Sequence, residues 1–178
     1  MNCSKTKSSC SLIILIIFLI TGCRHNNPPV TSEQYNQVQQ HMEGVNRLLI
    51  KKDRQRILGY IERQKLNMQE SGTGLWYMIE NKGNGRKSQT GNIATINYKV
   101  SLLDGTPCYN SDIDGPKTFQ IGKGGIESGI EEGILKLNEG GKAKFIIPPH
   151  LAYGLLGDEK KIPARAILIY EIELVSLQ

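Results

Sequence analysis

The sequence predicts an α+β fold, in which a twisted antiparallel sheet packs on one central helix and is preceded by a short N-terminal helical segment. Two observations carry this prediction. From residue 75 onward, apolar and polar residues alternate with the period of two that is typical of strands. One stretch within this region, residues 127–137, has its apolar residues at helical spacing instead. An antiparallel sheet covered by one helix is an α+β arrangement.

Residues 1–22 have the pattern of a secretory signal peptide. Lys5 and Lys7 form a basic start, and residues 12–20 are an unbroken apolar run. The run is shorter than the roughly 20 apolar residues that a spanning helix needs, so it does not predict a permanent membrane span.

Residues 20–23, Ile-Thr-Gly-Cys, resemble the bacterial lipobox. The resemblance implies cleavage before Cys23, lipid attachment to its sulfur and anchoring to a membrane. An ordinary signal peptide followed by an incidental cysteine is the alternative. Cys3 and Cys10 would be removed with the signal peptide, and Cys23 would carry lipid. Cys108 would then be the only free thiol, so no intramolecular disulfide is expected.

The net charge does not indicate a nucleic-acid partner. The chain carries +5 overall, of which residues 1–22 contribute +2 and residues 23–74 contribute +3, while residues 75–178 are neutral. A neutral domain on a mildly basic segment has an ordinary solvated surface with, at most, a weak attraction to anionic lipid headgroups.

Neither a metal site nor a phosphate site is predicted. His25, His41 and His150 have no carboxylate or cysteine at ligand spacing. Gly122–Gly125 reads Gly-Lys-Gly-Gly, which lacks the spacing and the terminal Lys-Ser/Thr of a P-loop. No cofactor is therefore expected.

The segment before the sheet is predicted to be a tether followed by helices. Residues 23–30 are polar and contain two prolines, which suits an extended tether. Thr31 and Gln34 have capping-box spacing and begin a first helix, and Asp53 is expected to cap a second helix that ends before residue 71. Two interpretations stay open: the helices pack against each other or the sheet domain, or they dimerise through an apolar stripe within residues 31–66. The apolar positions are Tyr35, Val38, Met42, Val45, Leu48, Leu49, Ile57, Leu58 and Ile61.

The sheet is expected to have one solvated side. Strand 93–103 places its apolar residues on one face and its polar residues on the other. Asp104-Gly105 is a hairpin signal that joins this strand to the segment holding Cys108 and Tyr109. The predicted strands span residues 75–80, 93–103, 117–121, 142–147 and 166–176.

The motifs of this region, in their order and spacing, resemble the FKBP-type peptidyl-prolyl cis/trans isomerase domain. The resemblance implies an FKBP-like sheet and an activity that needs neither a nucleophile nor a metal. The stretch 107–111, Pro-Cys-Tyr-Asn-Ser, further resembles isomerase lipoproteins associated with gliding motility in Bacteroidetes. The motifs are Tyr98, Asp104-Gly105, Phe119–Gly122, Gly129–Gly133, Ile147–Pro149, Ala152–Gly154, Ile162-Pro163 and Tyr170.

The resemblance implies an aromatic cup that receives a proline ring. The cis form of a bond before proline lies within roughly 1 kcal/mol of trans, yet interconversion is slow because rotation of the planar amide has a barrier of about 18–20 kcal/mol. The twisted amide is less well solvated by water, so an apolar pocket favours it. The implied catalytic residues are Tyr98, Tyr109, Tyr153 and Glu127, and the implied substrate-binding residues are Phe119, Ile126, Ile130, Ile162, Tyr170 and Cys108.

Individual roles follow from the same resemblance. Ile130 would be the floor, the Tyr153 hydroxyl would meet a substrate carbonyl, and the backbone N–H of Glu127 would hold another carbonyl. A core position on a strand is the competing interpretation for each aromatic residue. Glu131 and Glu132 lie in the first helical turn, where carboxylates stabilise the helix dipole, so a structural role is expected for them.

The chain departs from the family pattern at the rim of the cup. Members usually have Phe-Asp where this chain has Cys108-Tyr109, and the arginine that normally faces the aspartate is absent. Three interpretations stay open: the Tyr109 ring restores the wall, its hydroxyl replaces the carboxylate as a hydrogen-bond partner, or the site turns proline bonds over slowly. Lys117 stands where an aromatic is common, and residues 155–161 are expected to alter substrate choice.

The predicted function is a prolyl isomerase that assists the folding of exported, proline-containing polypeptides in the bacterial cell envelope. The residue after Cys23 is Arg24, whereas an aspartate at this position holds some lipoproteins at the inner membrane. This difference favours the periplasmic face of the outer membrane. The rival is an FKBP-fold binding or chaperone module with weak or no catalysis. The predicted parts are a signal peptide (1–22), a lipid anchor and tether (23–30), a helical stalk (31–74) and the isomerase domain (75–178).

Overall fold

The computed structural model describes residues 31–178. The chain divides at Gly44 into a first unit, which ends at Glu43, and a second unit, Gly44–Gln178, which contains the whole sheet. The predicted signal peptide, the lipid attachment at Cys23 and the tether lie outside the described residues.

Helix α2 (Ser32–Gln64) begins at the predicted capping box. The Gln34 N–H donates to the Thr31 hydroxyl oxygen over 3.3 Å, and the Thr31 N–H donates to the Gln34 side-chain oxygen over 3.0 Å, which confirms the box. The helix then continues through Asp53, so the prediction of a second helix capped there is wrong. Residues 45–58 contain neither glycine nor proline, so nothing in this stretch ends the first helix.

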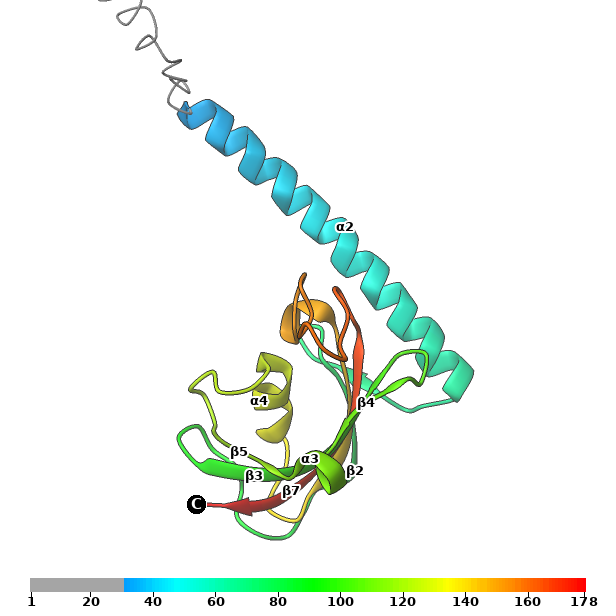
Figure 1. Ribbon diagram of the computed structural model, residues 1–178, viewed down its shortest axis with the longest axis vertical. Coiled ribbons are helices and arrows are strands. Elements are labelled where there is room, and N and C mark those ends of the chain that lie inside the picture. Colours follow the sequence, from blue (N-terminus) through cyan, green and yellow to red (C-terminus); the bar gives the residue numbers. More distant parts are fainter. Residues whose placement is uncertain (1–30) are drawn as a thin grey trace, which may run out of the picture. The chain divides into compact units, whose positions relative to one another are not determined.

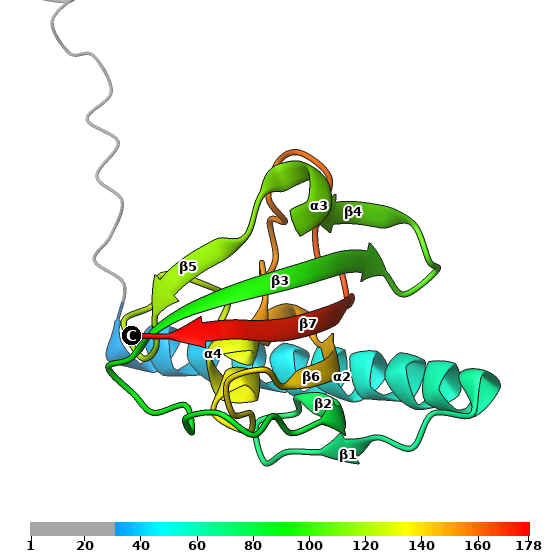
Figure 2. The same ribbon diagram turned by 90° about the horizontal axis from the view of Figure 1, so that it is seen from below.

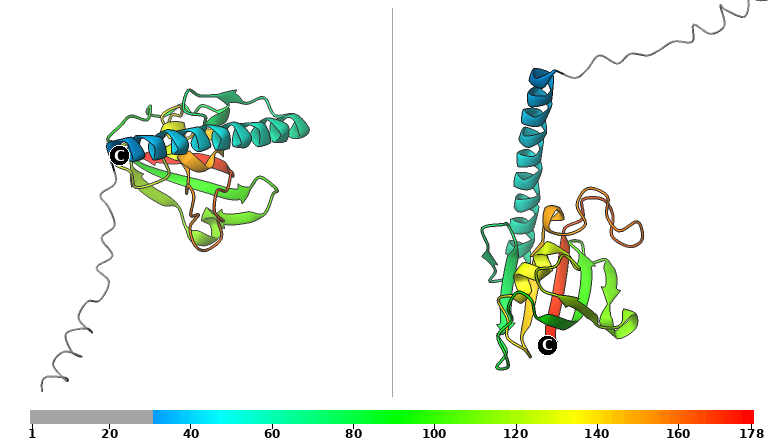
Figure 3. Two further views of the ribbon diagram at one scale, coloured as in Figure 1. Left: turned by 90° about the horizontal axis from the view of Figure 1, so that it is seen from above. Right: turned by 90° about the vertical axis from the view of Figure 1, so that its left-hand side faces the viewer.

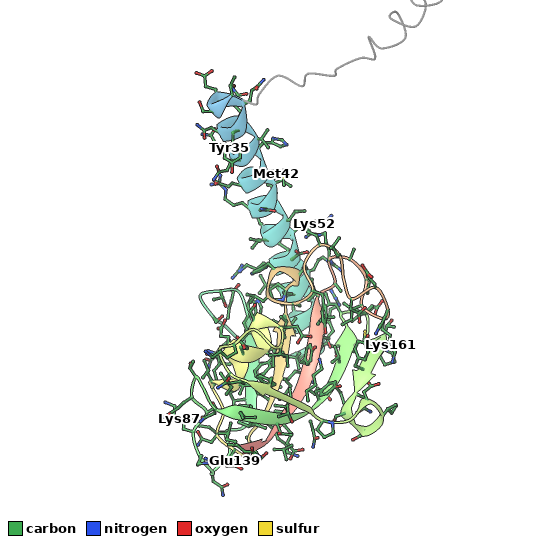
Figure 4. The ribbon with its side chains drawn as sticks, turned by 60° about the vertical axis from the view of Figure 1, so that its left-hand side comes forward. Tyr35, Met42, Lys52, Lys87, Glu139 and Lys161 are labelled. Carbon is green, nitrogen blue, oxygen red and sulfur yellow. The ribbon has the colours of Figure 1, made fainter. Side chains whose placement is uncertain are left out.

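The apolar residues of the first unit are exposed. Tyr35, Val38 and Met42 are 65%, 62% and 52% exposed, and Figure 4 shows Tyr35 and Met42 on this part of α2. The dimer through residues 31–66 stays a prediction. None of the helices within residues 31–178 combines the length and the apolar character that crossing a bilayer requires.

The second unit is built on one seven-stranded antiparallel sheet (Figures 1 and 2). Its strands are β1 (Gln69–Glu70), β2 (Trp76–Asn81), β3 (Ile93–Leu102), β4 (Pro107–Asn110), β5 (Lys117–Gln120), β6 (Lys142–Ile147) and β7 (Leu168–Leu177). The order is β1-β2-β6-β7-β3-β4, and β5 also pairs with β3. The long strands β3 and β7 lie side by side, as Figure 2 shows. The α+β prediction is confirmed, and the five predicted strands are found with their ends shifted by no more than two residues.

One face of the sheet packs against helix α4 (Ser128–Ile134). Ile130 is fully buried in this main core, and Gly133 permits close packing because a Cβ there would lie 2.6 Å from the Phe145 ring. The helix is shorter than the predicted span 127–137. After Ile134 the N–H groups bond three residues back, in a tighter turn that ends the α-helix.

The opposite face is covered in part by residues 44–64 of α2 (Figure 1). On β6, Ile146 points toward α2 while its neighbours Phe145 and Ile147 belong to the main core, as strand alternation requires. The predicted solvated side is therefore found along β3 but not across β6 and β7. The buried residues of this α2-facing cluster are Ile57, Trp76, Ile146, Ile167 and Ile169.

Candidate active site

The residues predicted to form the cup come together from separate segments of the second unit. They are supplied by β3, β4, β5, α4 with the residues before it, the loop after the short helix η1 (Pro149–Leu151), and β7. All the apolar and aromatic members belong to the main core or pack directly against it. They are Tyr98, Cys108, Tyr109, Phe119, Ile126, Ile130, Tyr153, Ile162 and Tyr170.

Burial divides these residues into a base and a mouth. The base is inaccessible to solvent, with Ile130 and Tyr170 at 0% exposure and Ile162 at 2%. Tyr98, Cys108 and Phe119 are also buried. The half-buried residues, which a substrate could touch first, are Tyr109, Ile126, Glu127 and Tyr153.

A carboxylate lies among the tyrosines of the cup. Glu127 directly precedes α4, and the buried Tyr170 hydroxyl donates to its Oε1 over 2.5 Å. Burial raises the pKa of the Tyr153 hydroxyl, and hydrogen bonding to the Glu127 carboxylate raises it further. Burial and then the charge of Glu127 likewise raise the pKa of Tyr170. The sequence prediction used only the backbone N–H of Glu127. Its side-chain role was missed, although a buried tyrosine hydroxyl ordinarily requires a partner.

The rim is held by a hydrogen bond between Tyr109 and Asp158. The Tyr109 hydroxyl donates to Asp158 Oδ2, while Asp158 Oδ1 accepts from the N–H groups of Lys160 (2.9 Å) and Ile162 (2.7 Å). This hydrogen bond, followed by burial, raises the pKa of Tyr109 to about 12. Burial acts to raise the pKa of Asp158, but the hydrogen bonds that it accepts outweigh burial and lower it. The Tyr109 hydroxyl is thus bonded to a carboxylate from the loop, while the Tyr109 ring packs against the main core, so both of these interpretations of Tyr109 stay predictions.

Two lysines stand over the tyrosines of the wall. The Lys117 ammonium lies 5.2 Å from the centre of the Tyr98 ring, and the Lys161 ammonium lies 4.8 Å from the centre of the Tyr109 ring. Both distances fit cation–π contacts. Tyr98 is also fixed through its backbone, whose N–H donates over 3.0 Å to the hydroxyl of Ser111 at the start of the short helix α3 (Ser111–Asp114).

Cys108 is part of the buried wall. Its sulfur lies 3.8 Å from the Thr106 carbonyl oxygen and 3.7 Å from the Lys161 carbonyl oxygen. Burial raises the pKa of the thiol, so the side chain packs as a neutral group. Within residues 31–178, no group of three or more histidine, cysteine, aspartate or glutamate side chains is arranged to hold a metal ion.

Glu131 and Glu132 make structural contacts. Glu131 Oε1 accepts from the backbone N–H groups of Gly122 (3.1 Å) and Gly124 (3.0 Å), which fixes the loop before α4. Glu132 Oε2 accepts from the Thr73 hydroxyl over 2.5 Å. These contacts agree with a structural role for both carboxylates. Only Glu131 lies in the first turn of α4, so the predicted first-turn position of Glu132 is wrong.

Comparison with known proteins places these features in a family. The model of the FKBP-type peptidyl-prolyl cis-trans isomerase family matches residues 84–175. The FKBP-type peptidyl-prolyl cis-trans isomerase FkpA of Escherichia coli (strain K12) is 36% identical over 109 residues, which are 61% of this chain and 39% of FkpA. The match spans less than half the length of the curated relatives.

Two crystal structures share the fold. FkpA from Escherichia coli has a TM-score of 0.60 at 24% identity, covering 100% of this chain and 84% of that chain, a likeness that shows the fold alone. AtFKBP13 has a TM-score of 0.59 at 31% identity, covering 63% of this chain and 99% of that chain. The family match covers more than half of the chain and includes every predicted cup residue. The chain therefore belongs to the FKBP-type peptidyl-prolyl cis-trans isomerase family.

Proposed function

We propose that this chain is a peptidyl-prolyl cis/trans isomerase that assists the folding of exported proteins and acts without covalent chemistry. The observation that carries the proposal is the gathering of the aromatic and aliphatic cup residues into one cluster with a half-buried mouth. Family membership supports the same function.

In the proposed mechanism, the proline ring of a substrate enters the cup above Ile130. Transfer from water into apolar surroundings removes the solvation that favours the planar amide, so the twisted amide gains relative to it. The Tyr153 hydroxyl would turn from the Glu127 carboxylate to a substrate carbonyl, and the backbone N–H of Glu127 would hold another carbonyl. Because rotation breaks no covalent bond, catalysis requires only that the cup bind the twisted amide more tightly than the planar one.

A protease-coupled assay with proline-containing peptides tests this proposal. The soluble form that begins after Cys23 is expected to accelerate isomerisation above the uncatalysed rate, in proportion to enzyme concentration. Rates at background, together with retained binding of proline peptides, would exclude the enzyme and leave the second candidate function, a proline-binding or chaperone module. The observation that favours this second candidate is the engagement of the Tyr109 and Tyr170 hydroxyls with Asp158 and Glu127, which leaves fewer donors for a substrate.

Replacing Tyr153 by phenylalanine is expected to lower kcat/KM by about 3- to 10-fold, which is the effect of losing one neutral hydrogen bond. The matched control is Tyr77→Phe. Tyr77 also packs against the main core and donates its hydroxyl over 2.8 Å, but to Gln69 on β1. The control should isomerise at the rate of the unmodified chain. Equal rates for the two variants in the peptide assay would show that the Tyr153 hydroxyl does not take part in isomerisation.

The proposal includes attachment of the chain by lipid at Cys23 to the periplasmic face of the outer membrane. Cys23→Ser is expected to move the full-length chain from the membrane fraction to the soluble fraction after expression in a bacterium that processes lipoproteins. A Cys108→Ser variant should stay with the membrane. Retention of Cys23→Ser in the membrane fraction would refute lipid anchoring.

We also propose a role in gliding motility, on the resemblance at residues 107–111. Deletion of the gene in a gliding host would then stop spreading on agar. The Tyr153→Phe variant would restore spreading only in part if isomerisation is what motility requires.

A further inference from the structure

The middle of α2 contains a buried carboxylate with a single close partner. Asp53 is 5% exposed, and the Arg165 guanidinium donates to its Oδ2 over 2.7 Å. Arg56 lies farther away, with its nitrogen 3.8 Å from Asp53 Oδ1. A buried carboxylate is retained at a high desolvation cost unless it is paired, so this arrangement depends on Arg165.

Arg165 closes the loop that forms the rim of the cup. We define the rim loop as residues 154–165, which follow Tyr153 directly and contain Asp158 and Ile162. The Arg165 N–H donates to the Gly154 carbonyl over 3.1 Å, so the two ends of the loop are joined. Its φ of 57° is a left-handed conformation that residues with a Cβ rarely adopt, so the contacts of Arg165 must hold it there.

The ion pair bridges a loosely filled space between α2 and the rim loop. A cavity of about 390 Å³ and a second of about 220 Å³ both have Leu49, Asp53 and Arg165 in their walls. Both ends of the rim loop line these cavities: its start at Gly154 lines the smaller one, and its end at 163–165 lines the larger one together with Lys52. Figure 3 shows the loop beside α2, and Figure 4 labels Lys52 on α2 and Lys161 on the loop. Among residues 31–178, the Arg165–Asp53 contact is the only hydrogen bond between α2 and the rim loop.

We propose that Asp53 and Arg165 are positioning residues of the isomerase site, whose ion pair fixes the rim loop to α2 and thereby holds Tyr153, Asp158 and Ile162 in their catalytic arrangement. The inference rests on the proposed isomerase function. Residues 44–64 of α2 would then support the cup. The isomerisation rate would depend on α2, although this helix contributes no residue to the cup.

The neighbouring residue on α2 provides a matched control. Arg54 forms a two-pronged contact with Glu70 on β1, with nitrogen–oxygen distances of 2.7, 2.8 and 3.0 Å. This pair also links α2 to the sheet unit, but it does not touch the rim loop. The test therefore compares Asp53→Asn and Arg165→Gln with Arg54→Gln and Glu70→Gln.

Hydrogen exchange measures the position of the loop independently of activity. The backbone amides of Asp158 and Ile162 form hydrogen bonds within the rim loop. In the Asp53→Asn and Arg165→Gln variants, these amides should exchange about tenfold faster than in the unmodified chain. In the Arg54→Gln and Glu70→Gln controls their exchange should be unchanged. Unchanged exchange in Asp53→Asn and Arg165→Gln, or an equal acceleration in the controls, would overturn the inference. Should Asp53→Asn fail to fold, Arg165→Lys replaces it in both measurements, because it keeps the charge but exchanges the planar guanidinium for an ammonium group on a shorter side chain.

The peptide assay then measures the consequence, at a temperature where circular dichroism shows every variant folded. Each single variant of the ion pair should lose about tenfold in kcat/KM, because a misplaced site residue lowers the rate of the chemical step. The double variant Asp53→Asn/Arg165→Gln should recover part of this loss, since two amides can hydrogen-bond to each other. Full rates in the single variants would overturn the inference. An inactive unmodified chain would refute the proposed function, while hydrogen exchange would still decide whether the pair positions the loop.

Discussion

Replacing Gly157 by alanine is expected to lower the kcat/KM of the proposed isomerase by about 100-fold, because the rim loop cannot keep its path around a side chain there. Gly157 has a φ of +79°, and a Cβ at this position would lie 2.2 Å from the backbone oxygen of Ile162. Backbone cannot rotate away as a side chain can, so the loop must open. Asp158, the next residue, would then lose its hydrogen bonds to Tyr109 and Ile162.

Gly154→Ala separates crowding from backbone strain. Gly154 begins the same loop with a φ of +61°, but a Cβ there would meet no atom within 4 Å. This variant should therefore lose about 1–2 kcal/mol of stability through the left-handed conformation and keep most of its activity. The measurements are the peptide assay and urea unfolding of both variants. If both lose activity equally, crowding at Ile162 is not the cause.

The sheet was predictable because the information for it is local. Strand β3 alternates along the sequence, and the two sides of that alternation, Tyr98 and Lys99 for example, are buried and exposed as expected. The hairpin at Asp104-Gly105 is also encoded by adjacent residues, with Gly105 at a φ of +92°. The cup residues were gathered by a family pattern, which supplies the long-range arrangement that periodicity lacks.

The polar contacts of the site were not predictable in the same way. Tyr109 and Asp158 are 49 residues apart, Tyr170 and Glu127 are 43 apart, and Asp53 and Arg165 are 112 apart. No spacing rule links such pairs. Asp53 was instead interpreted from its local sequence as a helix cap, because aspartate favours that position. In the folded chain Asp53 lies inside α2, and its carboxylate pairs with the distant Arg165.

The same limitation applies to the α2-facing cluster, where the sequence shows that Ile57 is apolar but not what it covers. Replacing Ile57 by alanine is expected to lower the free energy of unfolding by about 2–5 kcal/mol, as large-to-small changes in a core do. Ile57 is 1% exposed and packs with Trp76, the only tryptophan in the chain, so tryptophan fluorescence during urea unfolding reports directly on this cluster.

The next residue on the helix, Leu58, gives the control for this measurement. It is 37% exposed, so Leu58→Ala removes a similar side chain while leaving little or no cavity, and the loss should be about 0.5 kcal/mol. A large difference between the two variants would mean that one face of residues 44–64 is bound to the sheet as part of its core. Equal and small losses would mean that the helix is only a linker, and the ion pair of Asp53 with Arg165 would then have no fixed element from which to hold the rim loop.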